Sequence, residues 1–435
     1  MKKSLSLVMI VLLCFSFTSV FANGLSLNSI GTRSLGMGGA FIGLANDYSA
    51  IYWNPAGLAR VKGPQFSIFA TDIIPQGTYQ VTFPAALGGA SVDAETRMNH
   101  YISLNAMGYL PLFCGKKLFA GIGAFVPAGL GAEWDGADLA AFSGPSGTAF
   151  EWMSMIGVFN FSPGIAYLVN DKISVGAALN LFYGQMDMKQ PMDTYNMMTQ
   201  QPGEDGMMDA QYEESGTGLG YGLSLGLLVK PIEKLSVGLS FKTKTTVTFE
   251  GTASNSAFKA YNAEETDYER DLAWPMWIGG GIAFCATEKL TLTADVQYSK
   301  WSETEETIVT TYKDAVWDAQ VNQTGQNEMH LNWEDATQIR FGAQYKVTDV
   351  LAVRAGYYND PAPAPDETLN IIFPSVSYNA ITAGGSYCLG KISLDLGFEY
   401  LMGEDREIPF ESAYEMPGTH GMNIIAASFG MTYNF

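Results

Sequence analysis

The sequence predicts an all-β fold: a transmembrane antiparallel β-barrel of about 14 strands with an N-terminal hatch, or plug, inside its lumen. Three features predict this fold. Apolar residues alternate with small or polar residues over long stretches, the alternation restarts after short turns, and the chain ends inside such a stretch. Strands of this kind need an apolar solvent on one face and a polar lumen on the other.

Six short turns are each followed at once by a new alternating stretch. Strands are therefore expected to begin at the following positions: Leu118, Ile173, Leu235, Leu290, Leu351 and Ile392. In the stretch 235–242, apolar residues occupy the odd positions, and serine, glycine and lysine occupy the even ones. Six hairpin turns join twelve strands, and one further strand at each end brings the count to about fourteen. The spacing of roughly 40 to 60 residues between restarts fits two strands and one long outer loop.

Residues 1–22 have the pattern of a secretory signal peptide. Lys2 and Lys3 precede an apolar run, and Val20 and Ala22 stand before an expected cleavage site at Asn23. Cys14 lacks the small neighbouring residue of a lipoprotein signal, so lipidation is not expected. An exported barrel without a helical span indicates a multi-pass protein of the bacterial cell outer membrane.

The last predicted strand, 423–435, ends on an aromatic residue without a tail. A chain that stops on Phe435 inside a strand resembles the C-terminal signal of bacterial outer-membrane barrels. This resemblance implies that the barrel assembly machinery is a partner.

Residues 23–62 do not alternate, although they are apolar and rich in glycine. Such a segment is too apolar to be a free tail in water, and it has no strand period with which to join the wall. A fourteen-stranded barrel has a lumen wider than its own wall side chains fill. The sequence therefore predicts a hatch over residues 23–62 and the barrel over residues 63–435. Gly36, Gly38 and Gly39 are expected to let the hatch backbone turn tightly and approach the wall.

Two motifs in this segment carry a resemblance to a known family. The run Gly-Met-Gly-Gly-Ala-Phe at 36–41 and the triplet Asn54, Pro55 and Ala56 resemble the hatch of the FadL family. That family comprises the long-chain fatty acid and hydrophobic compound transporters of the bacterial outer membrane. A looser likeness runs through 125–130 and 162–167 to the end of the chain. The resemblance implies passive uptake of a hydrophobic small molecule, which leaves sideways into the membrane through the barrel wall.

Two other functions remain open. Shuttle barrels of the type IX secretion system have a similar glycine-rich start, which makes a protein-interaction barrel one alternative. Polar residues at inward positions, such as Asp295 and Arg340, favour an aqueous porin as the other. No arginine or lysine can be singled out as a carboxylate partner, so hydrocarbons are expected as cargo beside fatty acids.

Prolines and glycines predict where the wall opens. Pro127 and Gly129 lie in the third strand, and Pro163 and Gly164 lie in the fourth. Proline has no backbone N–H to donate to the neighbouring strand, and glycine has no side chain to close a gap. We therefore expect a lateral opening between these two strands, with both prolines at similar height along the barrel axis. The alternative is that Pro127 only ends its strand and that a bulge absorbs Pro163.

No catalytic site, metal site or cofactor is expected. The three histidines lie far apart in the sequence: His100, His330 and His420. His100 and Ser103 superficially offer residue types that outer-membrane lipases use, but residues three apart in a strand face opposite sides. Three cysteines remain after processing, without metal spacing and with an open redox state: Cys114, Cys285 and Cys388.

The chain carries a net charge of −20, which excludes nucleic acid as a partner. Acidic residues concentrate in 264–271 and 303–306, which are expected as outer loops. There they keep the surface solvated or contact lipopolysaccharide through divalent ions. The segment 186–208 holds seven methionines, which indicate either a landing surface for lipophilic cargo or a loop folded over the barrel mouth.

Overall fold

The computed structural model describes residues 24–111, 117–192, 195–196, 201–202, 210–304, 306–411 and 414–435. The expected signal peptide, residues 1–22, lies outside this part, as does Cys114. Four methionines of the 186–208 segment also lie outside it: Met197, Met198, Met207 and Met208. No helix among the described residues is long and apolar enough to cross a membrane.

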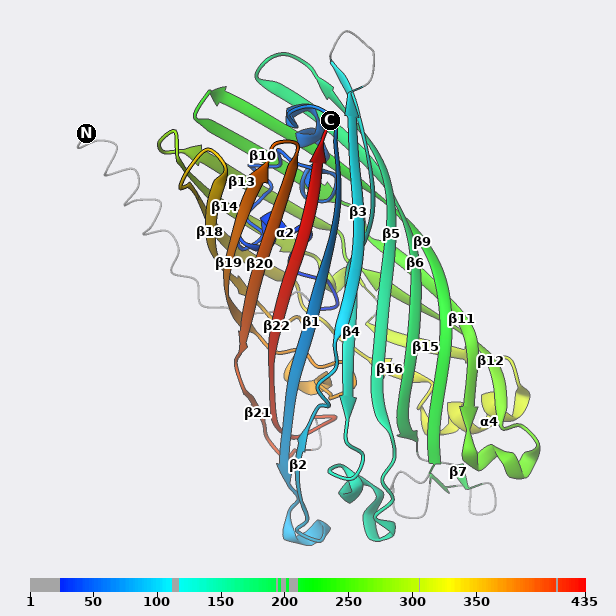
Figure 1. The fold of residues 1–435 in the computed structure, drawn as a ribbon. Helices are drawn as coiled ribbons and strands as arrows, with labels where there is room; N and C mark the ends of the chain where they lie inside the picture. The colour runs from blue at the N-terminus through cyan, green and yellow to red at the C-terminus, as the bar shows by residue number, and fades with distance from the viewer. Residues whose placement is uncertain are drawn as a thin grey trace.

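Within the described residues the chain forms a closed antiparallel barrel of 14 strands, as the sequence predicts (Figure 1). Some of the 14 strands are interrupted, so two labelled segments can belong to one strand that crosses the membrane. The barrel closes where β1 (Gln65–Thr82) pairs with β22 (Gly418–Asn434), from Gln65 opposite Asn434 to Gln80 opposite Thr419. Closure leaves neither the first nor the last strand as a free sheet edge in lipid, where unpaired backbone groups cannot be hydrated.

The first half of the wall consists of β2 (Ser91–Glu95), β3 (Tyr101–Pro111), β4 (Leu118–Trp134), β5 (Trp152–Leu168), β6 (Ile173–Met192), β9 (Ala210–Ile232), β10 (Leu235–Lys242) and β11 (Thr245–Asn255). The second half consists of β12 (Glu265–Trp274), β13 (Trp277–Cys285), β14 (Leu290–Ser299), β15 (Thr307–Tyr312), β16 (Glu328–His330), β17 (Ala336–Lys346), β18 (Leu351–Asp360), β19 (Tyr378–Leu389), β20 (Ile392–Gly403) and β21 (Arg406–Ile408). The segments β10 and β11, which both pair with β9, are an example of two segments in one interrupted strand. A separate two-stranded sheet pairs β7 (Tyr195–Asn196) with β8 (Gln201–Pro202).

Helical segments are short. Those of the N-terminal segment are α2 (Thr32–Leu35), α3 (Ala50–Trp53) and the 3-10 helix η1 (Pro55–Arg60). Those of the connections are η2 (Ala85–Leu87), η3 (Ala140–Ser146), η4 (Ser256–Tyr261), η5 (Trp301–Glu303), α4 (Ala315–Thr324) and η6 (Asp366–Thr368). Most of the second group lie near the lower end of the barrel in Figure 1, opposite the end that carries the C-terminus.

The short turns and the alternation agree with the sequence prediction. The strands β4, β6, β10, β14, β18 and β20 each begin at the predicted residue. In β10, Val237 and Leu239 are exposed on the outer face, whereas Ser236 and Ser240 are buried towards the lumen. Exposed apolar side chains of this kind recur around the wall, which is the arrangement of a barrel whose outer solvent is lipid.

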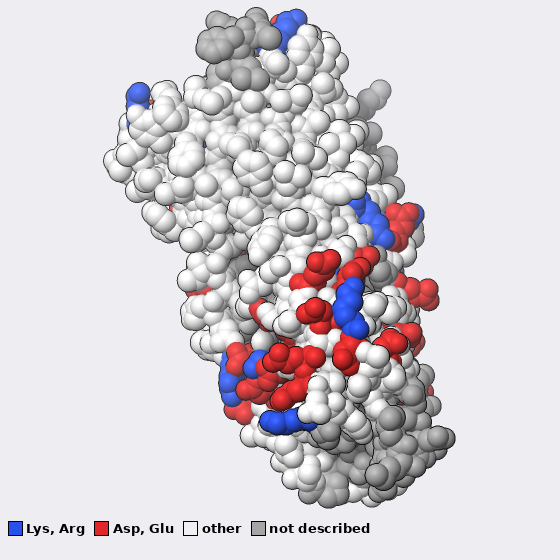
Figure 2. All heavy atoms as spheres, turned by 90° about the vertical axis from the view of Figure 1, so that its right-hand side faces the viewer, with Lys and Arg blue, Asp and Glu red and all other residues white. Residues whose placement is uncertain are grey.

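On the face shown in Figure 2, most charged side chains lie in the lower part of the barrel. Figure 2 shows acidic and basic residues gathered in the lower part of this face, while the upper part is almost uncharged. The acidic residues expected in an outer loop at 264–271 lie mostly in β12, with Asp267 and Asp271 exposed. That expectation was wrong because β12 pairs with β11 over its whole length, so the acidic face belongs to wall that continues past the uncharged part. The uncharged part has the character of a lipid-facing belt.

The half of the lumen at the lower end of the barrel in Figure 1, which we call the outer half, is filled by an apolar core. Trp301, Trp317 and Trp333 are buried there, and Arg270 donates two hydrogen bonds to Glu214 at 2.6 and 2.8 Å. Met186, Met188 and Met192 belong to the same core and are at most 2% exposed. These three methionines therefore pack inside the barrel instead of forming an exposed landing surface.

The inner half of the lumen is occupied by residues 24–62, whose helical turns lie within the barrel (Figure 1). Almost every residue from Ile30 to Ala59 is buried, and Phe41, Trp53 and Leu58 are at most 1% exposed. These side chains form a second core with wall residues such as Phe69 and Phe125. We refer to residues 24–62 as the hatch.

Candidate functional site

The Asn54–Pro55–Ala56 motif fixes a turn of the hatch against the wall. The side-chain oxygen of Asn54 accepts a hydrogen bond from the Ala56 backbone N–H at 3.2 Å, which caps η1. Its amide nitrogen donates to the carbonyl oxygens of Ile42 in the hatch and Leu227 in β9, each at 3.1 Å. Asn54 thus connects two parts of the hatch to one wall strand.

Wall glycines make this close approach possible. A Cβ atom on Gly226 of β9 would lie 2.1 Å from the Asn54 side-chain oxygen. A Cβ atom on Gly176 of β6 would lie 2.4 Å from the carbonyl carbon of Pro55. Larger residues at either position would force the turn away from the wall.

The hatch glycines approach the opposite side of the barrel. Gly38 and Gly39 have φ angles of +63° and +64°, which L side chains rarely adopt. The Gly38 N–H donates to the Thr382 hydroxyl at 2.9 Å, and a Cβ atom on Gly36 would lie 3.0 Å from the Cα of Gly384. The predicted close approach of these glycines is therefore present, although the structure does not test whether they gate transport.

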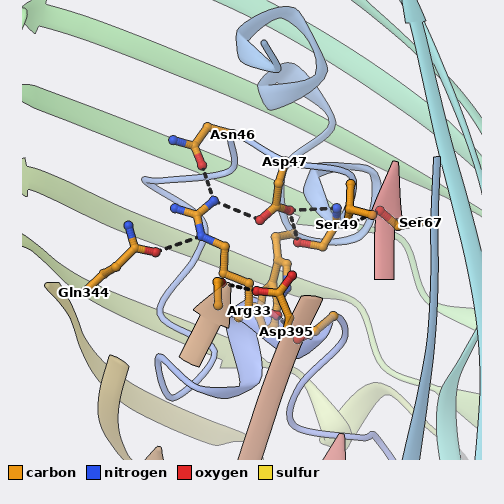
Figure 3. A network of polar contacts seen from close by, with 12 residues as sticks. Arg33, Asn46, Asp47, Ser49, Ser67, Gln344 and Asp395 are labelled. Atoms are coloured by element: carbon orange, nitrogen blue, oxygen red, sulfur yellow. Dashed lines mark hydrogen bonds and ion pairs between the residues drawn. The ribbon is translucent and has the colours of Figure 1, made fainter. Parts of the chain in front are cut away.

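A polar network ties the first helical turn of the hatch to the wall (Figure 3). Arg33 donates to Asn46 at 2.7 Å, to Asp47 at 2.9 Å and to Gln344 of β17 at 3.0 Å. The same Gln344 oxygen accepts a hydrogen bond from Arg354 of β18 at 2.9 Å. Because Arg354 also pairs with Asp395 of β20 at 3.2 Å, one continuous network of bonded charges joins the hatch to three wall strands.

Two further inward-facing charges hold the hatch backbone. Asp295 of β14, only 1% exposed, accepts a hydrogen bond from the Ile42 N–H at 2.7 Å. Arg340 of β17 donates to the carbonyl oxygens of Asn28 and Gly38 at 2.9 and 3.1 Å. The sequence placed both charges in the lumen as signs of an aqueous porin, but in the structure they bind the hatch.

The wall has a window between the second and third crossings, which are formed by β3 and β4. Their ladder runs from Pro111 opposite Phe119 to Ala106 opposite Ala124 and then stops. Beyond that point the backbone N–H of Val126 donates to the Asn105 side chain at 2.9 Å. The next pairing between these two parts of the chain is the bridge of Thr96 with Trp134, so residues 101–105 do not pair with the stretch of β4 that they face.

The start of the hatch borders this window. The Leu27 N–H donates to the Pro127 carbonyl at 2.9 Å, and the Gly129 N–H donates to the Leu25 carbonyl at 3.0 Å. Ser26 and Ala128 form an antiparallel bridge between these two bonds. Residues 25–27 therefore occupy the edge of β4 that β3 leaves free.

The structure contradicts the predicted opening between the third and fourth strands. The ladder of β4 with β5 continues past Pro163, which lies opposite Ile122, to Trp134 opposite Trp152. Its one irregularity is a bulge between Phe125 and Ala128, which absorbs Pro127 and its missing N–H. The prolines do not share a height either, since Pro127 lies five positions along β4 from the residue opposite Pro163, about 16 Å at ~3.3 Å per residue. Pro127 and Gly129 border the window, whereas Pro163 and Gly164 lie where β5 stays paired with β4.

A cavity of about 530 Å³ leads from the lumen through the window. Its inner part is lined by hatch residues 28–30 and by Tyr378, Leu401 and Met422. Its outer part is lined by Phe159 and Tyr183, whose exposed side chains face outward from β5 and β6. A lining with both lumen-facing and lipid-facing residues means that the cavity crosses the wall.

Several residues of the cavity were not predicted as site residues. They are Asn28, Ser29, Ser103, Asp360 and Glu399. A carboxylate at an inward strand position, where the pattern otherwise places small or weakly polar residues, was the available signal for the last two. No group of three or more histidine, cysteine, aspartate or glutamate side chains in the described part is placed to hold a metal ion.

The comparisons with known proteins agree with this architecture. A family model described as "Outer membrane protein transport protein (OMPP1/FadL/TodX)" matches residues 13–435. The chain belongs to the OMPP1/FadL/TodX family. The protein is accordingly an outer-membrane, multi-pass β-barrel. The family is made of transport channels rather than enzymes.

Solved structures of family members share the fold. A FadL homologue of Pseudomonas aeruginosa is 16% identical, with a TM-score of 0.76 over 95% of this chain and 100% of that chain. The toluene transporter TodX of Pseudomonas putida is 18% identical, with a TM-score of 0.70 over 96% and 100%. The toluene transporter TbuX of Ralstonia pickettii is 18% identical, with a TM-score of 0.69 over 94% and 99%.

Curated relatives are similarly distant. Outer membrane protein P1 of Haemophilus influenzae is 20% identical over 421 residues, covering 88% of this chain and 87% of that protein. A 47 kDa outer membrane protein of Pasteurella multocida is 23% identical over 223 residues, so the match spans half of that relative.

Proposed function

We propose that this member of the OMPP1/FadL/TodX family is a channel for passive uptake of small hydrophobic molecules, either hydrocarbons or long-chain fatty acids. In this proposal the hatch gates the route and the cargo leaves sideways through the window. The observation that carries it is the cavity that joins the lumen to the lipid-facing side of the wall. An apolar solute loses free energy when it leaves water, so a route that ends in lipid favours its passage.

The hatch supports gating because its residues line the route. Asn28 and Ser29 contribute to the cavity and are hydrogen-bonded to Asp360 and Glu399 of the wall. Cargo in the inner part of the cavity therefore touches the hatch itself. The names of two family members with the same fold, the toluene transporters TodX and TbuX, support an apolar cargo.

Two partners belong to this proposal. The barrel assembly machinery would recognise the last strand through Phe435, which is 67% exposed. Membrane lipid would surround the uncharged belt, and lipopolysaccharide would contact the acidic part of the outer surface through divalent ions (Figure 2).

The experiment compares uptake of radiolabelled toluene and oleate by cells that carry or lack the protein, beside swelling of sugar-loaded liposomes that contain it. We expect several-fold faster uptake of at least one hydrophobic compound and no swelling with sugars. Swelling without hydrophobic uptake would identify an aqueous porin. Neither activity, together with a secreted protein bound to correctly folded barrel, would favour the interaction barrel.

Neighbouring residues of β3 offer a matched pair of variants for the window. Ser103 is buried and lines the cavity, whereas Leu104 is 72% exposed on the lipid-facing side. Ser103→Trp should lower hydrophobic uptake at least fivefold, because the indole fills the window, and Leu104→Trp should leave it unchanged. Equal uptake by both variants at equal barrel levels would contradict sideways release through this window.

A further inference from the structure

The inner end of the cavity carries acidic groups and no basic side chain. Among the described residues, those that line the cavity include Asp360 and Glu399 but no lysine or arginine. Among the described lining residues, the only one with a basic side chain is His100, at the outer end of the cavity. Its side chain is 55% exposed, and its Nδ1 lies 2.7 Å from a carboxylate oxygen of Asp72. Cargo that reaches the inner end therefore meets carboxylates.

Glu399 has an oxygen available at this end. Its Oε1 accepts hydrogen bonds from Tyr358 at 2.8 Å and from Ser29 at 3.2 Å. Its Oε2 has no hydrogen-bond partner among the described residues, although the residue is only 5% exposed. This oxygen is not fully enclosed by protein, and a carboxylate oxygen on a cavity wall is a strong hydrogen-bond acceptor for a ligand.

Asp360 lies at the same end and already has donors. It accepts hydrogen bonds from the side chains of Asn28 and Gln338. Glu399 is thus the carboxylate with an acceptor site left for a ligand, and Asp360 adds negative charge beside it.

Two cations near the hatch, Arg340 and Lys242, do not line the cavity, although the Nε of Arg340 has no hydrogen-bond partner. Arg340 donates to Asn28, Gly38 and Gln338 and does not line the cavity. The amino group of Lys242 lies 3.2 Å from the ring centre of Tyr52 and 4.7 Å from that of Trp277, also outside the cavity. An incoming carboxylate would lose its hydration without gaining a cationic partner, which is costly in a buried site.

We infer that the cargo of this cavity is a lipophile whose polar end is a hydrogen-bond donor, such as an alcohol, a phenol or an amine, and that Glu399 accepts from it. Fatty-acid anions are disfavoured. This inference rests on the proposed uptake function and narrows its cargo. The apolar tail of the ligand lies along the window, between Tyr101 and Leu130, and the donor end reaches the hatch.

The test measures binding of four ligands with the same ten-carbon chain to the purified, detergent-solubilised protein: decan-1-ol, decylamine, decanoate and decane. Competition against radiolabelled decan-1-ol at pH 9 gives the relative affinities. We expect decan-1-ol and decylamine to bind at least tenfold more tightly than decanoate. Glu399→Gln keeps an acceptor oxygen but removes the negative charge, so it should narrow the preference for decan-1-ol over decanoate to within threefold.

Glu250→Gln is the matched control, because Glu250 is exposed on the outer face of β11, away from the cavity. It should keep the full preference of the wild-type protein. Equal binding of decanoate and decan-1-ol by the wild-type protein would overturn the inference, whether or not Glu399→Gln folds. Binding of all four ligands with one affinity would leave the proposed uptake intact, whereas binding of none, decane included, would overturn both.

Discussion

At the scale of single residues, the hatch is held by side chains that each serve two partners. Asn54 caps η1 and donates to carbonyl groups of both hatch and wall. Gln344 accepts from Arg33 of the hatch and Arg354 of the wall with one oxygen. A buried acceptor that loses its donor is not rehydrated, so one substitution at such a position affects both partners.

Asn54→Ala should loosen the hatch while the barrel still assembles. The change leaves the carbonyl oxygens of Ile42 and Leu227 without this donor, at a cost of about 1–3 kcal/mol. We expect a several-fold change in the rate of hydrophobic uptake, measured with labelled cargo at equal amounts of outer-membrane protein. Asn322→Ala, in the exposed part of α4, is the control. Wild-type uptake kinetics in correctly folded Asn54→Ala protein would show that the motif only packs the hatch and does not affect transport.

At the scale of elements, β4 exchanges partners along its length. It pairs with β3 near the short turn, with residues 25–27 at the window, and with Thr96 beyond the window. Hatch residues 25–27 are joined to β4 by two backbone hydrogen bonds, far fewer than a wall strand makes with its neighbour. It is therefore the element at the window that can separate at the lowest cost in free energy.

A disulfide between Ser26→Cys and Ala128→Cys should lock the hatch onto β4. The two residues are bridge partners in an antiparallel pair, which brings their Cα atoms into disulfide range. In a background without native cysteines, oxidation should lower uptake at least fivefold, and reduction should restore it. A control disulfide between Ala132→Cys and Ser154→Cys, opposite each other in β4 and β5, should have no effect. Equal uptake in both redox states, with the crosslink verified, would show that the start of the hatch does not move.

At the scale of the whole molecule, the barrel closes through β1 and β22, but the last residue lies outside that ladder. The register ends at Asn434 opposite Gln65, and Phe435 adds one backbone hydrogen bond to Pro64 at 3.1 Å. Its exposed ring packs against Tyr433, with 4.9 Å between ring centres. The stability of the finished barrel thus depends little on Phe435.

Deletion of Phe435 should reduce the amount of protein in the outer membrane at least fivefold, because the assembly machinery would lose its recognition residue. Refolding of the purified chain into detergent should proceed with nearly unchanged yield and thermal stability. Phe429→Ala, which removes a lipid-facing ring from the same strand, should leave the outer-membrane level close to that of the wild type. A parallel loss of refolding yield on deletion of Phe435 would assign the residue a structural function instead.

The sequence by itself determined the barrel, its closing strand and the first residues of six strands. These features depend on a period of two and on turn residues, which are local properties of the chain. The family could also be inferred, because the hatch motifs are contiguous in sequence. Inward and outward faces followed for the same reason, including the inward position of Glu399.

Only the tertiary structure decided where the wall opens and which residues meet there. The window depends on a ladder that stops at Ala106 and on a hatch strand that takes the free edge of β4. Proline and glycine positions could not locate it, since a bulge absorbs Pro127 and β5 stays paired with β4 at Pro163. The acidic end of the cavity joins Ser29 to Glu399 across 370 positions of sequence, and no local pattern specifies a contact of that separation. Alternation tells which side chains enter the lumen, but packing of the hatch decides which of them become a binding site.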